Sequence, residues 1–282
     1  MSMGSPRTLS RKRRIRRKSQ RRLWCCGLAS LLALAVITGA HSPADQPRTP
    51  ATPAQAGRQQ AETWDEPLRL LDEARRAYKD VKDYSCTLIK REQVKGKVQP
   101  ENVINMKIRK EPFSVMLSWQ APRDLAGQEA AYVAGQNKNM MRVNPKGVAG
   151  IFGWQNIAID DPRVMEHSRH LITEAGIGNL IERFAKAYIA DSKTKTVKVS
   201  LADYEYDKKQ CIGIETIHSE ARPGHGDYYR CLLYIDKKSH LPIRCECYDR
   251  PRAKGSDGDL IEMYSFANLK INPGYGDDTF KR

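Results

Sequence analysis

The 282-residue sequence lacks the short motifs that mark the commonest enzyme chemistries. It contains no Gly-x-Ser-x-Gly elbow, no His-Glu-x-x-His pair, no Gly-x-x-x-x-Gly-Lys loop and no Gly-x-Gly-x-x-Gly fingerprint. These absences argue against an α/β-hydrolase, a zincin, a P-loop NTPase and a Rossmann dehydrogenase. We therefore expect a protein with no catalytic residues and no cofactor.

Metal-ligating residues are few and poorly spaced. No Cys-x-x-Cys pair occurs, which argues against a zinc finger or ribbon. His167 and His170 lie close to Asp160, Asp161 and Glu166, but they form part of a polar loop, and we interpret both as surface residues. We expect no metal site.

Acidic residues are absent from the first forty positions, which hold ten Arg and Lys residues. An apolar run, residues 23–40, follows the basic stretch and ends in small residues. This pattern is typical of a signal peptide cleaved near Ala40, or of an uncleaved signal anchor that would keep the protein in contact with the membrane. Either interpretation predicts export to the periplasm or the cell exterior.

The net charge of +15 is no sign of nucleic-acid binding, because the leader accounts for ten of these charges and leaves only +5 for the rest of the chain. Charges of both signs alternate there, most simply as the wet faces of strands in the stretches IKREQ and KIRKEP. We expect a monomer with no nucleic-acid partner.

The chain after the leader divides into a linker and a single domain. Residues 41–61 are rich in Pro, Ala and Gln and have no apolar periodicity, so we expect a disordered linker. Residues 62–282 contain the periodic segments and form the predicted domain.

The domain is predicted to be mainly β (α+β). Apolar residues recur at helical spacing over 64–81 and 177–190, which predicts two amphipathic helices. Alternating or apolar runs bounded by turn residues predict about ten strands, over 83–93, 101–112, 113–122, 127–136, 138–145, 195–206, 210–221, 227–236, 241–249 and 259–272. Short connections favour one strongly curved antiparallel sheet that forms an incomplete barrel, with the two helices as its lid or plug.

Five cysteines remain after the leader, namely Cys86, Cys211, Cys231, Cys245 and Cys247. A hairpin over 227–249 would bring Cys231 close to Cys245 and Cys247, with Glu246 directly opposite in a strict register, and we predict a disulfide between Cys231 and Cys245. The alternative is a set of small buried apolar residues.

A curved sheet with an apolar concave side holds either a packed core or a ligand cavity. The side chains that we expect to line such a cavity come from two adjacent strands and the second helix: Met106, Ile108, Val115, Leu117, Trp119, Leu180, Ile181 and Phe184. The residues alone leave both possibilities open, because any β core contains such side chains.

Six segments between about residues 83 and 280 carry a resemblance to a known family: DYSCTLIKRE, KIRKEPFSVMLSW, GQEAAYVAGQNKN, LITEAGIGNLIERF, YIDKKSHLPIRCECYD and EMYSFANLKINPGYGDDTF. Over this stretch the chain resembles the exported bacterial family called domain of unknown function 1571. More distantly the chain is similar to the periplasmic lipoprotein carriers and receptors, the LolA and LolB proteins. That likeness implies an unclosed barrel with a helical lid and non-catalytic binding of acyl chains.

These observations together favour an envelope protein that binds an acyl chain or lipoprotein anchor in an apolar cavity. A structural or interaction protein with a solid β core is one alternative. An enzyme acting in the envelope, centred on Cys86 or on the loop of His167 and His170, is the other.

Overall fold

The computed structural model describes residues 52–53, 59–60, 63–220, 228–253 and 258–281. The expected leader and most of the expected linker lie outside these residues. All described residues belong to one unit, residues 46–282. Among them, no helix combines the length and the apolar character needed to cross a membrane.

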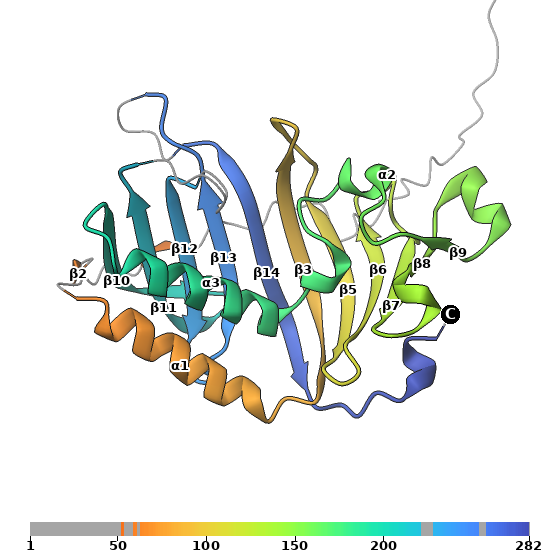
Figure 1. Cartoon of the computed structure of the whole chain (residues 1–282), viewed down its shortest axis with the longest axis horizontal. Helices are drawn as coiled ribbons and strands as arrows, with labels where there is room; N and C mark the ends of the chain where they lie inside the picture. The colour runs from red at the N-terminus through yellow and green to blue at the C-terminus, as the bar shows by residue number, and fades with distance from the viewer. Residues whose placement is uncertain (1–51, 54–58, 61–62, 221–227, 254–257, 282) are drawn as a thin grey trace, which may run out of the picture. The chain divides into compact units, whose positions relative to one another are not determined.

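Fourteen strands form one antiparallel sheet, and twelve of them follow the order β1-β10-β11-β12-β13-β14-β3-β5-β6-β7-β8-β9 (Figure 1). Of the other two, β2 pairs with β10 and β4 pairs with β3. The sheet is not closed, which confirms the predicted half-barrel. The strands are β1 (Thr52–Pro53), β2 (Gln59–Gln60), β3 (Asp83–Val94), β4 (Lys97–Val98), β5 (Asn102–Arg109), β6 (Ser114–Ala121), β7 (Glu129–Val133), β8 (Met141–Asn144), β9 (Gln155–Ile157), β10 (Val197–Tyr206), β11 (Lys209–His218), β12 (Arg230–Asp236), β13 (Pro242–Tyr248) and β14 (Leu260–Ile271).

The two predicted helices are present as α1 (Asp65–Lys79) and α3 (Ile177–Asp191). A third and much shorter helix, α2 (Pro162–Met165), lies in the segment that we expected to be a loop. Helix α1 has acidic residues in its first turn and basic residues in its last turn, which suits the helix dipole. An ion pair of Arg75 with Glu182, 2.8 Å long, joins α1 to α3.

The concave side of the sheet is the side that α1 and α3 cover (Figure 1). On this side β5 and β6 are paired as the alternation of apolar residues predicts, with Ile104 opposite Trp119 and Met106 opposite Leu117. Beneath α1 and α3 the side chains form one large packed core, whose strand members come from β3, β5, β6 and β10 to β14. We call this the packed region.

Part of the expected linker pairs with the sheet. Thr52–Pro53 and Gln59–Gln60 form β1 and β2 on strand β10. Strand β10 has β11 on its other side, so its outer edge presents free backbone groups that a passing segment can pair with. These four residues are therefore paired with the sheet, unlike the disordered linker that we expected. The rest of 41–61 lies outside the described residues.

The partner predicted for Cys231 requires correction. Cys231 lies opposite Cys247, with 2.7 Å between the two Sγ atoms, whereas Cys245 lies opposite Leu233. A register shift in the β12–β13 hairpin, between Tyr234 and Ile235, moves the pairing by one residue, and the sequence gives no sign of it. All five cysteines are free thiols in the structure, so Cys231 with Cys247 is the remaining candidate pair.

Candidate functional site

A cavity of about 810 Å³ lies on the concave side, next to the packed region. Strands β3, β5, β6, β7, β8 and β14 form its floor, and residues 158–176 with the first turns of α3 cover it. We call residues 158–176 the roof segment. The cavity together with its floor and its cover is called the cavity region. The apolar side chains that line it are Leu88, Pro100, Ile104, Leu117, Trp119, Pro122, Leu125, Ala130, Met141, Val143, Val164, Leu171, Ile172, Ala175, Leu180 and Phe266.

Three of the eight predicted lining residues face this cavity, and five do not. Leu117, Trp119 and Leu180 line it. The other five are buried in the packed region, namely Met106, Ile108, Val115, Ile181 and Phe184. The prediction assumed that the second helix is the lid. Instead α3 lies mainly over the packed region, and only its first turns, with Leu180 and Arg183, reach the cavity, which the roof segment otherwise covers. Ligand binding by any of the eight stays a prediction.

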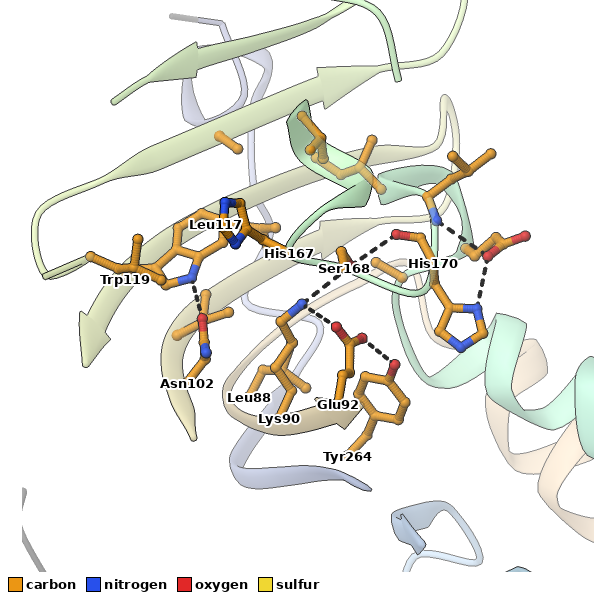
Figure 2. Close-up of a pocket in the computed structure, with 18 of the residues that line it drawn as sticks. Leu88, Lys90, Glu92, Asn102, Leu117, Trp119, His167, Ser168, His170 and Tyr264 are labelled. Carbon is orange, nitrogen blue, oxygen red and sulfur yellow. Dashed lines mark hydrogen bonds and ion pairs between the residues drawn. The ribbon is translucent and has the colours of Figure 1, made fainter. Parts of the chain in front are cut away.

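The aromatic wall of the cavity is held by a hydrogen bond. The indole Nε1 of Trp119 donates to Asn102 Oδ1 at 2.8 Å, and the Asn102 amide donates to the Pro100 carbonyl at 2.9 Å. Because its only polar group is satisfied, the Trp119 ring presents an apolar surface. Figure 2 shows this pair beside Leu117.

The roof segment has a capped helix near its start and a required glycine at its end. At its start, Asp161 caps α2 by accepting a hydrogen bond from the backbone N–H of Arg163 at 2.9 Å. At its end, Gly176 has φ of 101°, and a Cβ there would lie 2.5 Å from Tyr84 Oη. The same hydroxyl accepts the N–H of Ile177 at 2.7 Å. Only glycine fits where the roof meets α3.

One end of the cavity is polar. Lys90 Nζ lies 3.0 Å from Glu92 Oε2 and donates to Ser168 Oγ at 3.2 Å. Tyr264 donates its hydroxyl to the other oxygen of Glu92. Figure 2 shows these four side chains together, with His170 nearby. The side chains of Lys90 and Glu92 are only 13% and 2% exposed, so this ion pair is sheltered from solvent.

A second buried carboxylate lies behind this end. Glu262 lies 2.7 Å from Nε2 of His170, 3.1 Å from Arg183 and 3.4 Å from Arg169. Burial alone would raise the pKa of Glu262, but the hydrogen bond to His170 and the charge of Arg183 outweigh it and hold the pKa at about 2. Glu262 is therefore ionised, and it anchors α3 and the roof segment to β14.

The sequence interpretation missed this polar end. Lys90 and Glu92 belong to the stretch IKREQ, which we took for the wet face of a strand, yet both line the cavity. His167 and His170 were expected at the surface; His167 is exposed as predicted, His170 is half-buried, and both border the cavity. Alternation does place Lys90 and Glu92 on the same face as Leu88, and that was the available signal.

The candidates for catalysis do not come together, because His167 and His170 line the cavity and Cys86 does not. Cys86 lies in the packed core outside the cavity lining, and burial raises the pKa of its thiol well above the ordinary value. A thiol in this state is not a nucleophile at neutral pH. Within the described ranges, no three His, Cys, Asp or Glu side chains gather in a way that could hold a metal ion.

The architecture and the cavity define a class: an unclosed antiparallel half-barrel whose concave side shelters a largely apolar chamber. The family model called protein of unknown function (DUF1571) matches residues 81–282, and the chain belongs to this family. No curated protein has a significantly similar sequence.

Several solved structures are similar over most of the chain. Lipoprotein LppX of Mycobacterium tuberculosis is 14% identical, with 75% of this chain and 98% of that chain covered and a TM-score of 0.43. A LolA superfamily protein of Nitrosomonas europaea is 13% identical, with 79% and 99% covered and a TM-score of 0.30. A DUF1329 family protein of Desulfovibrio piger is 12% identical, with 76% and 96% covered and a TM-score of 0.35. At these TM-scores, no activity or ligand carries over.

Proposed function

We propose that this protein is a non-catalytic component of the cell envelope that holds an acyl chain, free or as a lipoprotein anchor, in its cavity. The observation that supports this most directly is the volume of about 810 Å³ beneath the roof segment, within the range of small-molecule sites. A sheet packed solid over its whole concave side, as in the interaction-protein alternative, would leave no such space.

The lining suits an alkyl chain. Its apolar side chains come from both the floor and the roof, so a bound chain would be enclosed by carbon on both sides. Burying a chain contributes about 0.8 kcal/mol per methylene group without any specific polar contact. Export by the basic and apolar leader would bring the protein to the membranes where such chains occur.

The test is to look for the chain itself. Protein produced from the full-length sequence and purified without detergent is extracted with organic solvent, and the extract is analysed by mass spectrometry. We expect an acyl lipid in near-stoichiometric amount. Ala130→Leu, which adds three carbons to the cavity floor, should lower the occupancy, whereas Ala130→Ser should not. An empty protein that also takes up no fluorescent fatty acid would contradict the proposal.

A further inference from the structure

The polarity of the cavity floor changes along the strands. Strands β14, β3 and β5 are paired so that their concave-side residues form three successive rows. The rows are Phe266, Leu88 and Ile104, then Tyr264, Lys90 and Asn102, and then Glu262 and Glu92. A ligand lying along the strands therefore meets carbon first, then an ammonium group with two neutral polar groups, and beyond them carboxylates.

Lys90 is the most enclosed of the cations that line the cavity. Its side chain is 13% exposed, compared with 37% for Arg183 and 76% for Arg163. Arg163 is paired with Asp161 at the rim, and Arg183 is held by Glu262. Lys90 is thus the cation that the interior of the cavity presents.

The ammonium group of Lys90 has one donor to spare. An ammonium carries three N–H donors, and two acceptors meet them among the described residues, Glu92 Oε2 and Ser168 Oγ. Glu92 is meanwhile shared, because it also accepts from Tyr264 and, at 3.3 Å, from the backbone N–H of Arg169. An enclosed ammonium with a free donor favours a further oxygen.

Charged side chains of both signs surround this end. Lys90, Arg169 and Arg183 face the buried carboxylates Glu92 and Glu262. Two further carboxylates, Asp124 and Glu174, line the cavity, and Glu174 is half exposed and faces His170 rather than Lys90. Because Lys90 carries a full positive charge and is sheltered from solvent, it attracts an anionic oxygen more strongly than a neutral one.

We infer that Lys90 binds an anionic oxygen, of a carboxylate or a phosphate, on the head of the ligand, so that the cavity takes acidic amphiphiles. The alkyl chain then lies over Leu88 and Ile104, towards Leu117 and Trp119. This inference rests on the proposed function, since it assumes that the cavity holds an alkyl chain.

The test compares three ligands that share one chain. Dodecanoic acid, dodecyl phosphate and dodecanol are titrated, at neutral pH, into protein that carries the neutral fluorescent probe N-phenyl-1-naphthylamine, and displacement is measured. We expect at least one of the two acids to bind about tenfold more tightly than the alcohol, as a hydrogen bond to a charged group implies. Which acid is preferred identifies the head group as carboxylate or phosphate.

Lys90→Met should remove the preference and leave dodecanol binding unchanged. Because this variant leaves Glu92 without its cation, Lys90→Met combined with Glu92→Gln provides a version with no unpaired charge. Lys198→Met, at an exposed position of β10, is the matched control. Equal binding of acids and alcohol by the wild type, or a preference that survives in both variants, overturns the inference. Failure of all three ligands to displace the probe would instead contradict the proposed function.

Discussion

Two neighbouring regions of one concave surface differ in what covers them. The packed region lies under α1 and α3, two helices of 15 residues each whose apolar faces reach the sheet. The cavity region lies under the roof segment, which has only α2, a helix of four residues, and a single 3-10 turn. Large apolar side chains fill the first region, and the second retains about 810 Å³ of space.

The elements that cover the sheet, rather than the sheet itself, therefore determine where the cavity lies. The floor strands are apolar in both regions. An amphipathic helix directs apolar side chains at the sheet in every turn, whereas the roof segment directs few apolar side chains at it. Polar contacts to Glu262 on β14 and Glu92 on β3 hold the roof in addition to the packing of Ile159, Val164 and Ile172. The region with the cavity is thus fixed partly by charges.

The largest expected contrast comes from one substitution made in both regions. Leu233→Ala removes a side chain that is 0% exposed in the packed region and should cost about 2–5 kcal/mol in the free energy of unfolding. Leu117→Ala, at the cavity wall, should cost less than about 2 kcal/mol, because a half-buried side chain is lost next to existing space. Urea denaturation measures both. Equal costs would show that the cavity region is packed as tightly as the core.

The opposite substitution sharpens the same comparison. Ala74→Leu adds volume beneath α1, where the alanine is 0% exposed, and overpacking there should cost about 1–3 kcal/mol. Ala130→Leu adds the same groups to the cavity floor and should leave the unfolding free energy within about 0.5 kcal/mol of the wild type. A large cost at Ala130 would mean that its neighbours leave no room.

Most of the packed region could be predicted from the sequence. The apolar periodicity of α1 and α3, and the alternation in β5 and β6, follow from residues that face one dominant core, so pattern and burial agree. Residues such as Met106 and Phe184 were correctly expected to face inward. Whether these side chains contact a ligand or one another depends on how the helices pack on the sheet, which the periodicity of the sequence does not specify.

The cavity region was predicted only in part, for physical reasons. Leu117, Trp119 and Leu180 were expected because they continue apolar patterns. Lys90 and Glu92 were missed, since a charged residue on a strand is ordinarily solvated and only its long-range partners, Ser168 and Tyr264, make its burial tolerable. The roof segment carries no periodic pattern, because scattered apolar residues such as Val164 and Ile172, together with polar contacts, hold it in place.

The last contrast concerns acid. The pKa of Glu262 in the folded protein is about 2, below its ordinary value of 4.5, so between these pH values the unfolded chain binds a proton that the folded chain does not. The stabilisation is therefore complete above pH 4.5 and is lost as the pH falls towards 2, with a slope of at most about 1.4 kcal/mol per pH unit. Glu262→Gln should flatten the pH dependence of unfolding measured by urea denaturation. Glu182→Gln, which removes the exposed partner of Arg75 in the packed region, should change the slope far less, because solvent screens that pair. If both variants kept the slope of the wild type, the charges that hold the roof segment would contribute no more to stability than a surface ion pair, and the division between the two regions would rest on packing alone.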